Sequence, residues 1–209
     1  MNKRSYSSAV RDEQAARTRR AIASVAAALF VEDGYAATSV AEIARRAGVT
    51  GQTVYNAFGT KAALLKAAYD MTLVGDDEAV PLAERPDVRA LYEQADPVAF
   101  LHGYADLGRV IVERVGPLLQ QVYAGAVTGE SALVEMRDTT DRERLIGVGM
   151  VAGRVAELGA LRPGLSQDEA RDRIWLLNSF EVWDLAARRG WSAEHTANWI
   201  GDAMCRAVL

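Results

Sequence analysis

Residues 38–65 carry the signals of two short helices joined by a tight turn. Ser39 and Glu42 have the spacing of a capping box, in which a hydroxyl and a carboxylate satisfy free N–H groups at a helix start. The apolar residues that follow recur with helical spacing, and Gly48 can adopt the left-handed conformation that ends a helix. Thr50 is a natural cap for the next helix. Two short helices held at a fixed angle in this way are typical of a helix-turn-helix unit.

The second helix, at about residues 51–57, is predicted to present a polar face. Val54 turns toward the core, whereas Gln52, Tyr55 and Asn56 share another face. Glutamine and asparagine can form paired hydrogen bonds with adenine, and the N-terminal part of a helix fits the major groove of DNA. We therefore predict that these three side chains face base edges or nearby phosphates. For Tyr55 the alternative is that it only packs against its own domain.

Lys61 stands at a helix start, where a cation is disfavoured. Gly59 ends the preceding helix and Thr60 caps the next one, so Lys61 lies at the positive end of the helix dipole. A DNA phosphate outside the helix would remove this conflict, and a solvated surface lysine is the alternative. Nearby hydroxyls complete the predicted contacts to the DNA backbone, which are those of Thr38, Ser39, Thr50 and Thr53.

These residues resemble the DNA-binding domain of the TetR family of bacterial transcriptional regulators. The stretch TSVAEIARRAGVTGQTVYNAFGTKAALL is similar to the family signature T-x-x-x-I-A-x-x-A-G-V-S-x-x-T-x-Y-x-H-F-x-x-K-x-x-L-L. Ala57 departs from it, because many members have a histidine there that can contact the DNA backbone. The resemblance covers residues 14–70 strongly and only the general helical pattern of the remainder. It implies a homodimeric, ligand-responsive regulator, usually a repressor, that binds double-stranded DNA.

The net charge of −4 conceals a separation of charge along the chain. Residues 1–61 contain 9 Lys or Arg and 5 Asp or Glu, a balance of +4, so the remainder carries −8. This separation is expected if only the N-terminal part faces DNA. Because an arginine-rich stretch is often just a solvated face, the charge supports the motif but does not replace it.

Composition and motifs argue against other function classes. No apolar run is long enough to span a membrane and the polar N-terminus has no signal-peptide pattern, so we expect a cytoplasmic protein. The single Cys205 and two distant histidines predict no disulfide and no metal site, and no cofactor is expected. Phosphate-loop, G-x-S-x-G and Glu-x-x-His motifs are missing, so no enzymatic activity is predicted. The alternative function is an all-helical small-molecule carrier or enzyme without a DNA role.

Helical spacing without strand-like alternation predicts an all-α chain of about nine helices. Residues 14–74 are predicted to form a three-helix DNA-binding domain and the helix after it, with the helix-turn-helix itself at about 39–58. The acidic segment 75–96, which contains two prolines, is the predicted boundary. Residues 75–209 are then expected to form a helical effector-binding and dimerisation domain.

Glycine and proline set the expected helix ends. The first helix is predicted over residues 14–33, after a disordered segment at 1–10. In the second domain Gly116-Pro117 is expected to stop a helix that starts near Asp96. A helix over 131–158 is expected, with an interruption near Thr139 left open. Another helix is predicted over 170–187, and the last helix follows Ser192.

All four tryptophans lie in the C-terminal part of the chain, between residues 175 and 199. Any single one would most simply belong to the core of the monomer, but together they suggest an interface, since aromatic residues concentrate in the centre of such contacts. The family resemblance implies that the last two helices pair with their copies in a four-helix dimer. The predicted interface residues are Trp175, Trp183, Trp199, Ile200, Ala203 and Met204.

A mainly apolar effector pocket is expected between the helices of residues 96–189. Ligand sites of this kind are typically apolar with a few polar anchors, and the resemblance implies one here. Each candidate is individually more often a core residue than a ligand contact. The candidates, chosen as polar or bulky groups at apolar helical positions, are His102, Tyr104, Tyr123, Met136, Met150, Asn178, Phe180, Glu181 and Trp183.

Overall fold

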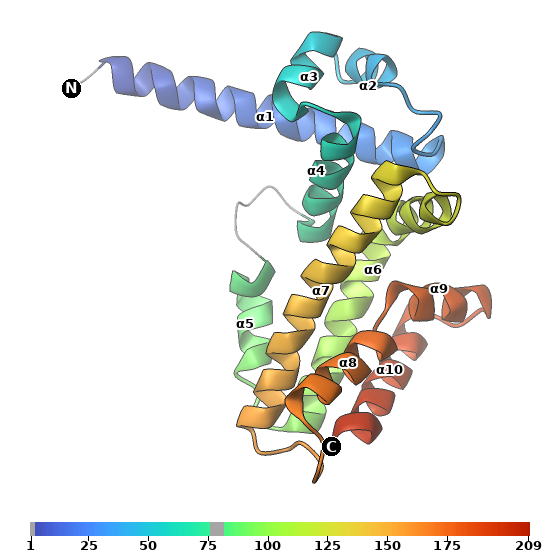
Figure 1. The fold of residues 1–209 in the computed structure, drawn as a ribbon. Helices are drawn as coiled ribbons and strands as arrows, with labels where there is room; N and C mark the ends of the chain where they lie inside the picture. The colour runs from blue at the N-terminus through green and yellow to red at the C-terminus, as the bar shows by residue number, and fades with distance from the viewer. Residues whose placement is uncertain (1–2, 76–81) are drawn as a thin grey trace. The chain divides into compact units, whose positions relative to one another are not determined.

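A computed structural model describes residues 3–75 and 82–209, with side chains within these ranges from residue 12 onward except at Ala83. The described residues form ten α-helices and one short 3₁₀ helix, and no strand occurs among them (Figure 1). The all-α fold predicted from the sequence is therefore confirmed.

The chain divides into two compact units, each built from two segments. The first unit comprises Met1–Asp77 and Gln120–Met136, and the second comprises Glu78–Leu119 and Arg137–Leu209. Part of the predicted boundary segment, residues 76–81, lies outside the described residues. The rest of that segment holds the 3₁₀ helix η1 (Leu82–Glu84) and the short helix α5 (Pro86–Tyr92).

The N-terminal segment of the first unit forms α1 (Lys3–Glu32), α2 (Val40–Arg46), α3 (Gly51–Phe58) and α4 (Lys61–Val74). The predicted start of the first helix at residue 14, after a disordered segment, was wrong, because α1 already begins at Lys3. No glycine or proline precedes Gly34, so no residue breaks the helix before that position. Gly34 itself has a φ of +81°, which glycine adopts readily, and α1 ends ahead of it.

The helix starts of the first unit follow the predicted caps. The hydroxyls of Ser39, Thr50 and Thr60 accept hydrogen bonds from the N–H groups of the residues three positions later, at 3.0 to 3.1 Å. α1 packs along α4, and α2 packs against α3. The side chains that these contacts bury completely include Ile22, Leu29, Phe30, Ile43, Leu64 and Leu65.

The second unit contains α5, α8 (Gln167–Leu177), α9 (Phe180–Arg188) and α10 (Ala193–Val208), together with most of α6 (Pro97–Val127) and α7 (Ser131–Glu157). The other ends of α6 and α7 belong to the first unit. The apolar core of the second unit joins α6, α7, α8, α9 and α10 through residues that include Phe100, Leu101, Val148, Val151, Ile174, Ile200 and Met204. Among the described residues, none of the helices is long and apolar enough to cross a membrane.

Two predicted helix ends in this part of the chain were wrong. Gly116-Pro117 does not stop the helix, because α6 continues through Pro117 to Val127. Proline costs a helix one hydrogen bond, but the neighbouring Val115, Leu118 and Leu119 are buried, and their burial favours continuing the helix. The helix predicted over 170–187 is instead broken in two at Asn178. α7 runs through Thr139 without interruption.

Candidate functional site

The polar face predicted for the second helix of the helix-turn-helix is exposed in the structure. Gln52, Tyr55 and Asn56 all lie on the solvent side of α3, with Tyr55 50% exposed. Gln52 Nε2 donates to Asn56 Oδ1 at 2.8 Å, so the two amides sit next to each other. Val54 and Phe58 bury the opposite side of the helix. The exposed amides keep further donors and acceptors that base edges can use.

Arg19 of α1 holds the end of α3 in place. Its guanidinium donates to the Ala57 carbonyl and lies over the Phe58 ring, with Cζ 4.2 Å from the ring centroid. A cation at a helix C-terminus satisfies a carbonyl and interacts favourably with the dipole. Sequence reasoning missed this residue, because only the fold brings Arg19 to α3. The backbone carbonyl of Ala57 thus has Arg19 as its hydrogen-bond partner.

Two of the predicted hydroxyl contacts lie at helix starts. Ser39 Oγ accepts from the Glu42 N–H at 3.1 Å, and its own O–H can still donate. Thr50 Oγ1 accepts from the Thr53 N–H and lies 2.9 Å from Thr53 Oγ1, where either hydroxyl can be the donor. These hydroxyls therefore serve as caps and still offer hydrogen-bond donors to a phosphate.

Thr38 differs from the other hydroxyls because it is buried, with 2% of its surface exposed. Its Oγ1 donates toward the carbonyls of Gly34 at 2.8 Å and Leu29 at 3.1 Å, which lie at the end of α1. The hydroxyl is thus used inside the domain, where it fixes the loop that leads to α2.

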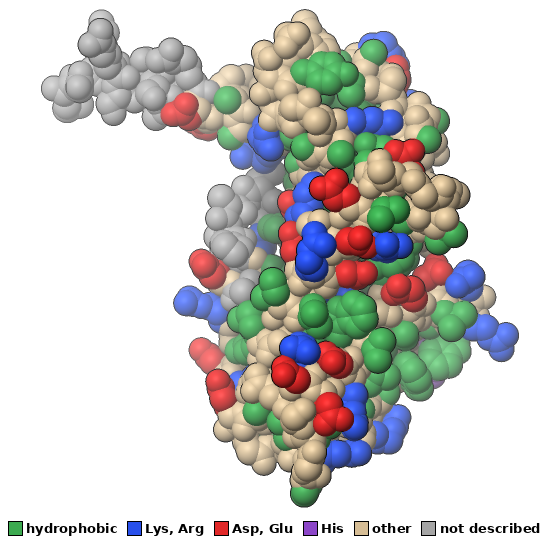
Figure 2. Space-filling model, viewed as in Figure 1, with side chains coloured by type: hydrophobic (Ala, Val, Ile, Leu, Met, Phe, Trp, Pro, Cys, Tyr) green, Lys and Arg blue, Asp and Glu red, His purple; other side chains and the backbone are tan. Residues whose placement is uncertain are grey.

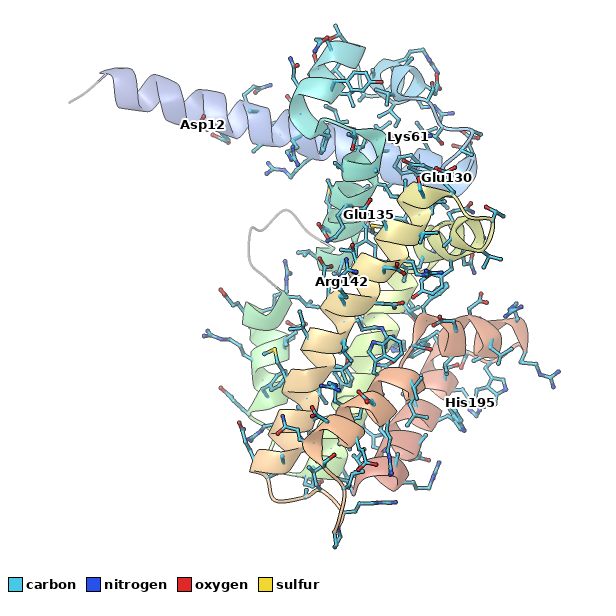
Figure 3. All side chains as sticks on the ribbon, in the orientation of Figure 1. Asp12, Lys61, Glu130, Glu135, Arg142 and His195 are labelled. Atoms are coloured by element: carbon cyan, nitrogen blue, oxygen red, sulfur yellow. The ribbon has the colours of Figure 1, made fainter. Side chains whose placement is uncertain are left out.

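Lys61 is only partly exposed at the start of α4 (Figure 3). Its Nζ lies 4.2 Å from the centroid of the Tyr35 ring, a cation–π contact. Burial lowers the pKa of Lys61, and the negative charge of Glu130, in the turn before α7, acts in the opposite direction. The ammonium therefore lies at the start of α4, as predicted, and it is held by an aromatic ring.

Glu42 forms an exposed cluster with two arginines of α2. Its carboxylate accepts from Arg45 Nε at 2.8 Å, Arg45 Nη2 at 2.7 Å and Arg46 Nε at 3.0 Å. Arg46 also donates to Glu32 of α1 at 3.2 Å. Hydrogen bonds from Arg45 and then Arg46 lower the pKa of Glu42 to about 2. The cluster links α2 to the end of α1.

In the second unit, three of the predicted pocket residues meet at the break between α8 and α9. Trp183 Nε1 donates to Asn178 Oδ1 at 2.8 Å, and the Tyr104 hydroxyl hydrogen-bonds the same amide. Burial raises the pKa of Tyr104 to about 12, so its hydroxyl stays neutral. Asn178 fits close to α6 only because residue 108 is glycine, since a Cβ there would lie 2.7 Å from Asn178 Oδ1.

Arg144 of α7 reaches the same break. Its Nη1 donates to the Trp175 carbonyl at 2.6 Å and lies 3.5 Å from the Asn178 carbonyl, so it caps the end of α8. The guanidinium also stacks on Trp175, with Cζ 4.2 Å from the ring centroid. We call Tyr104, Arg144, Trp175, Asn178 and Trp183 the elbow cluster. Sequence reasoning placed Trp175 in the dimer interface and missed Arg144.

The other predicted pocket residues do not join the elbow cluster. Tyr123 and Met136 belong to the first compact unit, and Met150 and Glu181 are exposed. His102 lies beside α10, with Nε2 3.3 Å from Asp202 Oδ1. Phe180 is partly buried at the start of α9.

The predicted dimer residues separate into buried and accessible sets. Trp183, Ile200 and Met204 lie in the core of their own unit, so their side chains have no free surface for a second chain. Trp175 and Ala203 are partly buried and Trp199 is 39% exposed. Hydrophobic side chains do gather on the surface over α9 and α10 (Figure 2). The large exposed apolar residues of this part of the chain are Leu176, Leu185, Trp191 and Trp199.

A comparison with protein-family models finds a match for the N-terminal helices. Residues 22–68 match the family model described as "Bacterial regulatory proteins, tetR family". The matched segment contains α2, α3 and most of α4, the same helices that hold the exposed amides and Lys61. No curated protein matches the chain.

Several solved structures share the fold over nearly the whole chain. The SmeT–triclosan complex is 21% identical with a TM-score of 0.68, over 92% of each chain. NalD, the secondary repressor of the MexAB-OprM multidrug efflux pump in Pseudomonas aeruginosa, is 24% identical with a TM-score of 0.67, over 92% of this chain and 97% of NalD. A TetR transcriptional regulator from Chloroflexus aurantiacus J-10-FL is 22% identical with a TM-score of 0.64, over 94% of this chain and 98% of that chain.

Proposed function

We propose that this chain, a member of the TetR family of bacterial regulatory proteins, is a repressor that leaves a palindromic operator when a small hydrophobic ligand binds. Membership of the family makes it a DNA-binding transcriptional regulator. Our proposal adds three points to that statement: the protein represses transcription, its operator is a palindrome, and a ligand releases it. The observation that carries the proposal is the exposed polar face of α3, a helix whose other side is buried and whose end is held by Arg19.

In this proposal the residues of the first unit have two kinds of contact. Gln52, Tyr55 and Asn56 face base edges, because a side chain reads sequence only from the groove. The hydroxyls of Ser39, Thr50 and Thr53 and the ammonium of Lys61 contact phosphates and set the register of the helix on DNA. Thr38 supports this set from inside the domain.

The proposal for α3 predicts different losses for two substitutions. Gln52→Ala is expected to lose roughly 1 to 3 kcal/mol of discrimination between cognate and scrambled DNA, because a base contact is removed. Lys61→Ala is expected to weaken binding to all sequences and to reduce the slope of log affinity against log salt by about one. Both are measured by gel shift or fluorescence anisotropy over a range of salt concentrations.

Lys66→Ala is the matched control for Lys61→Ala. Lys66 also lies on α4, but its ammonium pairs with Asp70 at 2.5 Å, so we expect its loss to change the salt slope little. Equal losses of Gln52→Ala on cognate and scrambled DNA would contradict the base contact. Absence of any selective shift with genomic fragments at low salt would favour a helical small-molecule carrier or enzyme without a DNA role.

The effector site belongs, in this proposal, to the second unit. SmeT is a structurally similar protein whose structure holds triclosan, and the elbow cluster offers polar groups among apolar helices here. A ligand can relieve repression only if it binds more tightly to a conformation with low operator affinity. Thermal-shift screening followed by operator release with each hit tests this part of the proposal.

We also propose that the protein acts as a homodimer in the cytoplasm, where its DNA target lies. We assign the interface to the exposed Leu176, Trp191 and Trp199. Trp183, Ile200 and Met204 are left out of it because their side chains are buried. A two-fold symmetric dimer presents two copies of α3, so the operator is expected to be a palindrome.

A further inference from the structure

Two hydrogen-bond donors of the elbow cluster are buried without an acceptor. Arg144 Nη2 and Trp175 Nε1 have almost no contact with solvent and make no hydrogen bond within the described part of the chain. Both groups can only donate, since neither a guanidinium nor an indole N–H has a lone pair to accept with. A buried donor left without an acceptor destabilises the folded state. The pair therefore marks a place where an acceptor is missing.

The acceptors nearby are already used or too distant. Asn178 Oδ1 accepts from Trp183 Nε1, and the Trp175 carbonyl accepts from Arg144 Nη1. Asp141 Oδ1 lies 3.7 Å from Arg144 Nη2, which is an ion-pair distance but longer than a hydrogen bond. If Arg144 served only as a helix cap, that role would account for the hydrogen bonds of Nη1. It would not account for the burial of Nη2 and of the Trp175 indole N–H without an acceptor.

The chemistry of these donors selects the class of ligand. Arg144 Nη1 is already bonded to the Trp175 carbonyl, so Arg144 Nη2 and the indole N–H of Trp175 are the donors left, and the two oxygens of a carboxylate can accept from both. We propose that the elbow cluster binds the carboxylate of a small amphipathic acid through Arg144 and Trp175. This inference rests on the proposed function and names the chemical class of the effector.

The surroundings fit an amphipathic acid rather than a free inorganic anion. The aromatic ring of Trp175 covers the guanidinium, and Val112, Leu177 and Val182 pack against the adjoining apolar core. The side chain of Arg144 is 24% exposed although its Nη2 is buried, so an acid has to approach from the exposed part of this side chain. The hydroxyl of Tyr104 is neutral at ordinary pH, and the negative charge next to the donors is that of Asp141, 3.7 Å from Arg144 Nη2, which the acid has to displace or share the guanidinium with.

The test is direct binding to the full chain without DNA, by titration calorimetry and thermal shift. The probes are benzoate, salicylate and octanoate at millimolar concentrations, with benzamide and octanamide as neutral counterparts. At least one acid is expected to bind, while its amide is not. Arg144→Gln is expected to weaken that binding about tenfold or more, and Trp175→Phe, which keeps a ring but removes the N–H, several-fold.

Arg142→Gln is the matched control. Arg142 lies on the same helix but is exposed (Figure 3), and its Nη2 donates to Thr139 Oγ1, so its removal is expected to leave acid binding unchanged. If Arg144→Gln does not fold, Trp175→Phe decides the result. No binding by any of the acids, equal binding of acid and amide, or acid binding unchanged in the folded variants would each overturn the proposal. Operator binding is measured without ligand, so a failure here is separate from a failure of the repressor proposal.

Discussion

The carboxylate of Glu42 is the residue of the first unit whose ionisation the structure changes most clearly. Its hydrogen bonds to Arg45 and Arg46 lower its pKa from 4.5 to about 2. Because the folded state holds this carboxylate ionised more strongly than the unfolded state, it contributes stability above pH 4.5. That contribution is expected to be lost as the pH falls from about 4.5 to about 2. A carboxyl ¹³C NMR titration of Glu42 checks the depressed midpoint.

The stability consequence is checked by comparing Glu42→Gln with the wild type. The variant is expected to be less stable at neutral pH, and the difference should shrink as the pH falls below 4. The size of the effect is small because the cluster is exposed. Glu13→Gln is the control, since Glu13 is exposed and its contact with Arg17 is longer, at 3.5 Å. Equal pH profiles for Glu42→Gln and the wild type would contradict the prediction.

Residues whose role depends on local spacing could be predicted from the sequence. Ser39, Thr50 and Thr60 cap the helices that follow them, because a cap involves only residues three positions apart. Arg19 could not be predicted to hold α3, since its partner Ala57 is 38 residues away. The contact between Lys61 and Tyr35 depends in the same way on how α1 packs along α4.

The break between α8 and α9 is held by contacts from two other helices. Asn178 connects α9 through Trp183 to α6 through Tyr104, and Gly108 leaves the space that its side chain fills. Gly108→Ala is expected to be destabilising, because its Cβ would meet Asn178 Oδ1 at 2.7 Å. Asn178→Ala is expected to cost about 1 to 3 kcal/mol, because it leaves the buried N–H of Trp183 without an acceptor.

The double variant gives the sharper measurement. If Gly108 and Asn178 are coupled through this contact, Gly108→Ala should cost less in the Asn178→Ala background than in the wild type. Urea unfolding of the four proteins measures the coupling. Gly147→Ala is the matched control, since a Cβ at that glycine would meet no atom within 4 Å. If the losses of unfolding free energy in the two single variants simply add in the double variant, the contact between Gly108 of α6 and Asn178 does not stabilise the break.

The helices of the second unit show that a proline or a long apolar run does not by itself predict where a helix ends. Pro117 gave a strong stop signal, yet the buried residues around it outweigh the lost hydrogen bond. The run from 170 to 187 gave no stop signal, yet it breaks at Asn178, where Arg144 of α7 bonds the freed carbonyls of Trp175 and Asn178. Both outcomes are set by tertiary packing, which periodicity does not describe.

For the whole molecule, the function proposed here requires two chains. A helix-turn-helix contacts only a few base pairs, and two copies on one dimer bind their half-sites with much higher combined affinity, on the order of 10² to 10⁴ above one copy. The sequence led to a predicted interface in the last helices that includes the exposed Trp199, but it could not separate exposed from buried apolar residues there. The helical pattern alone does not say which side of an apolar helix the core of its own chain covers.

Trp199→Glu tests the dimer and the operator together. Trp199 is 39% exposed and lies 5.9 Å from Trp191 between ring centroids, so a carboxylate there would enter the proposed interface without opening the core. The variant is expected to shift from dimer to monomer in light scattering at micromolar concentration. It should also lose affinity for a palindromic operator on the order of 100-fold while keeping weak binding to a half-site. Val127→Glu, at an 86% exposed position outside α8 to α10, is expected to change neither property. A monomeric wild type, or a Trp199→Glu protein that stays dimeric, would show that the chains pair through another surface or not at all.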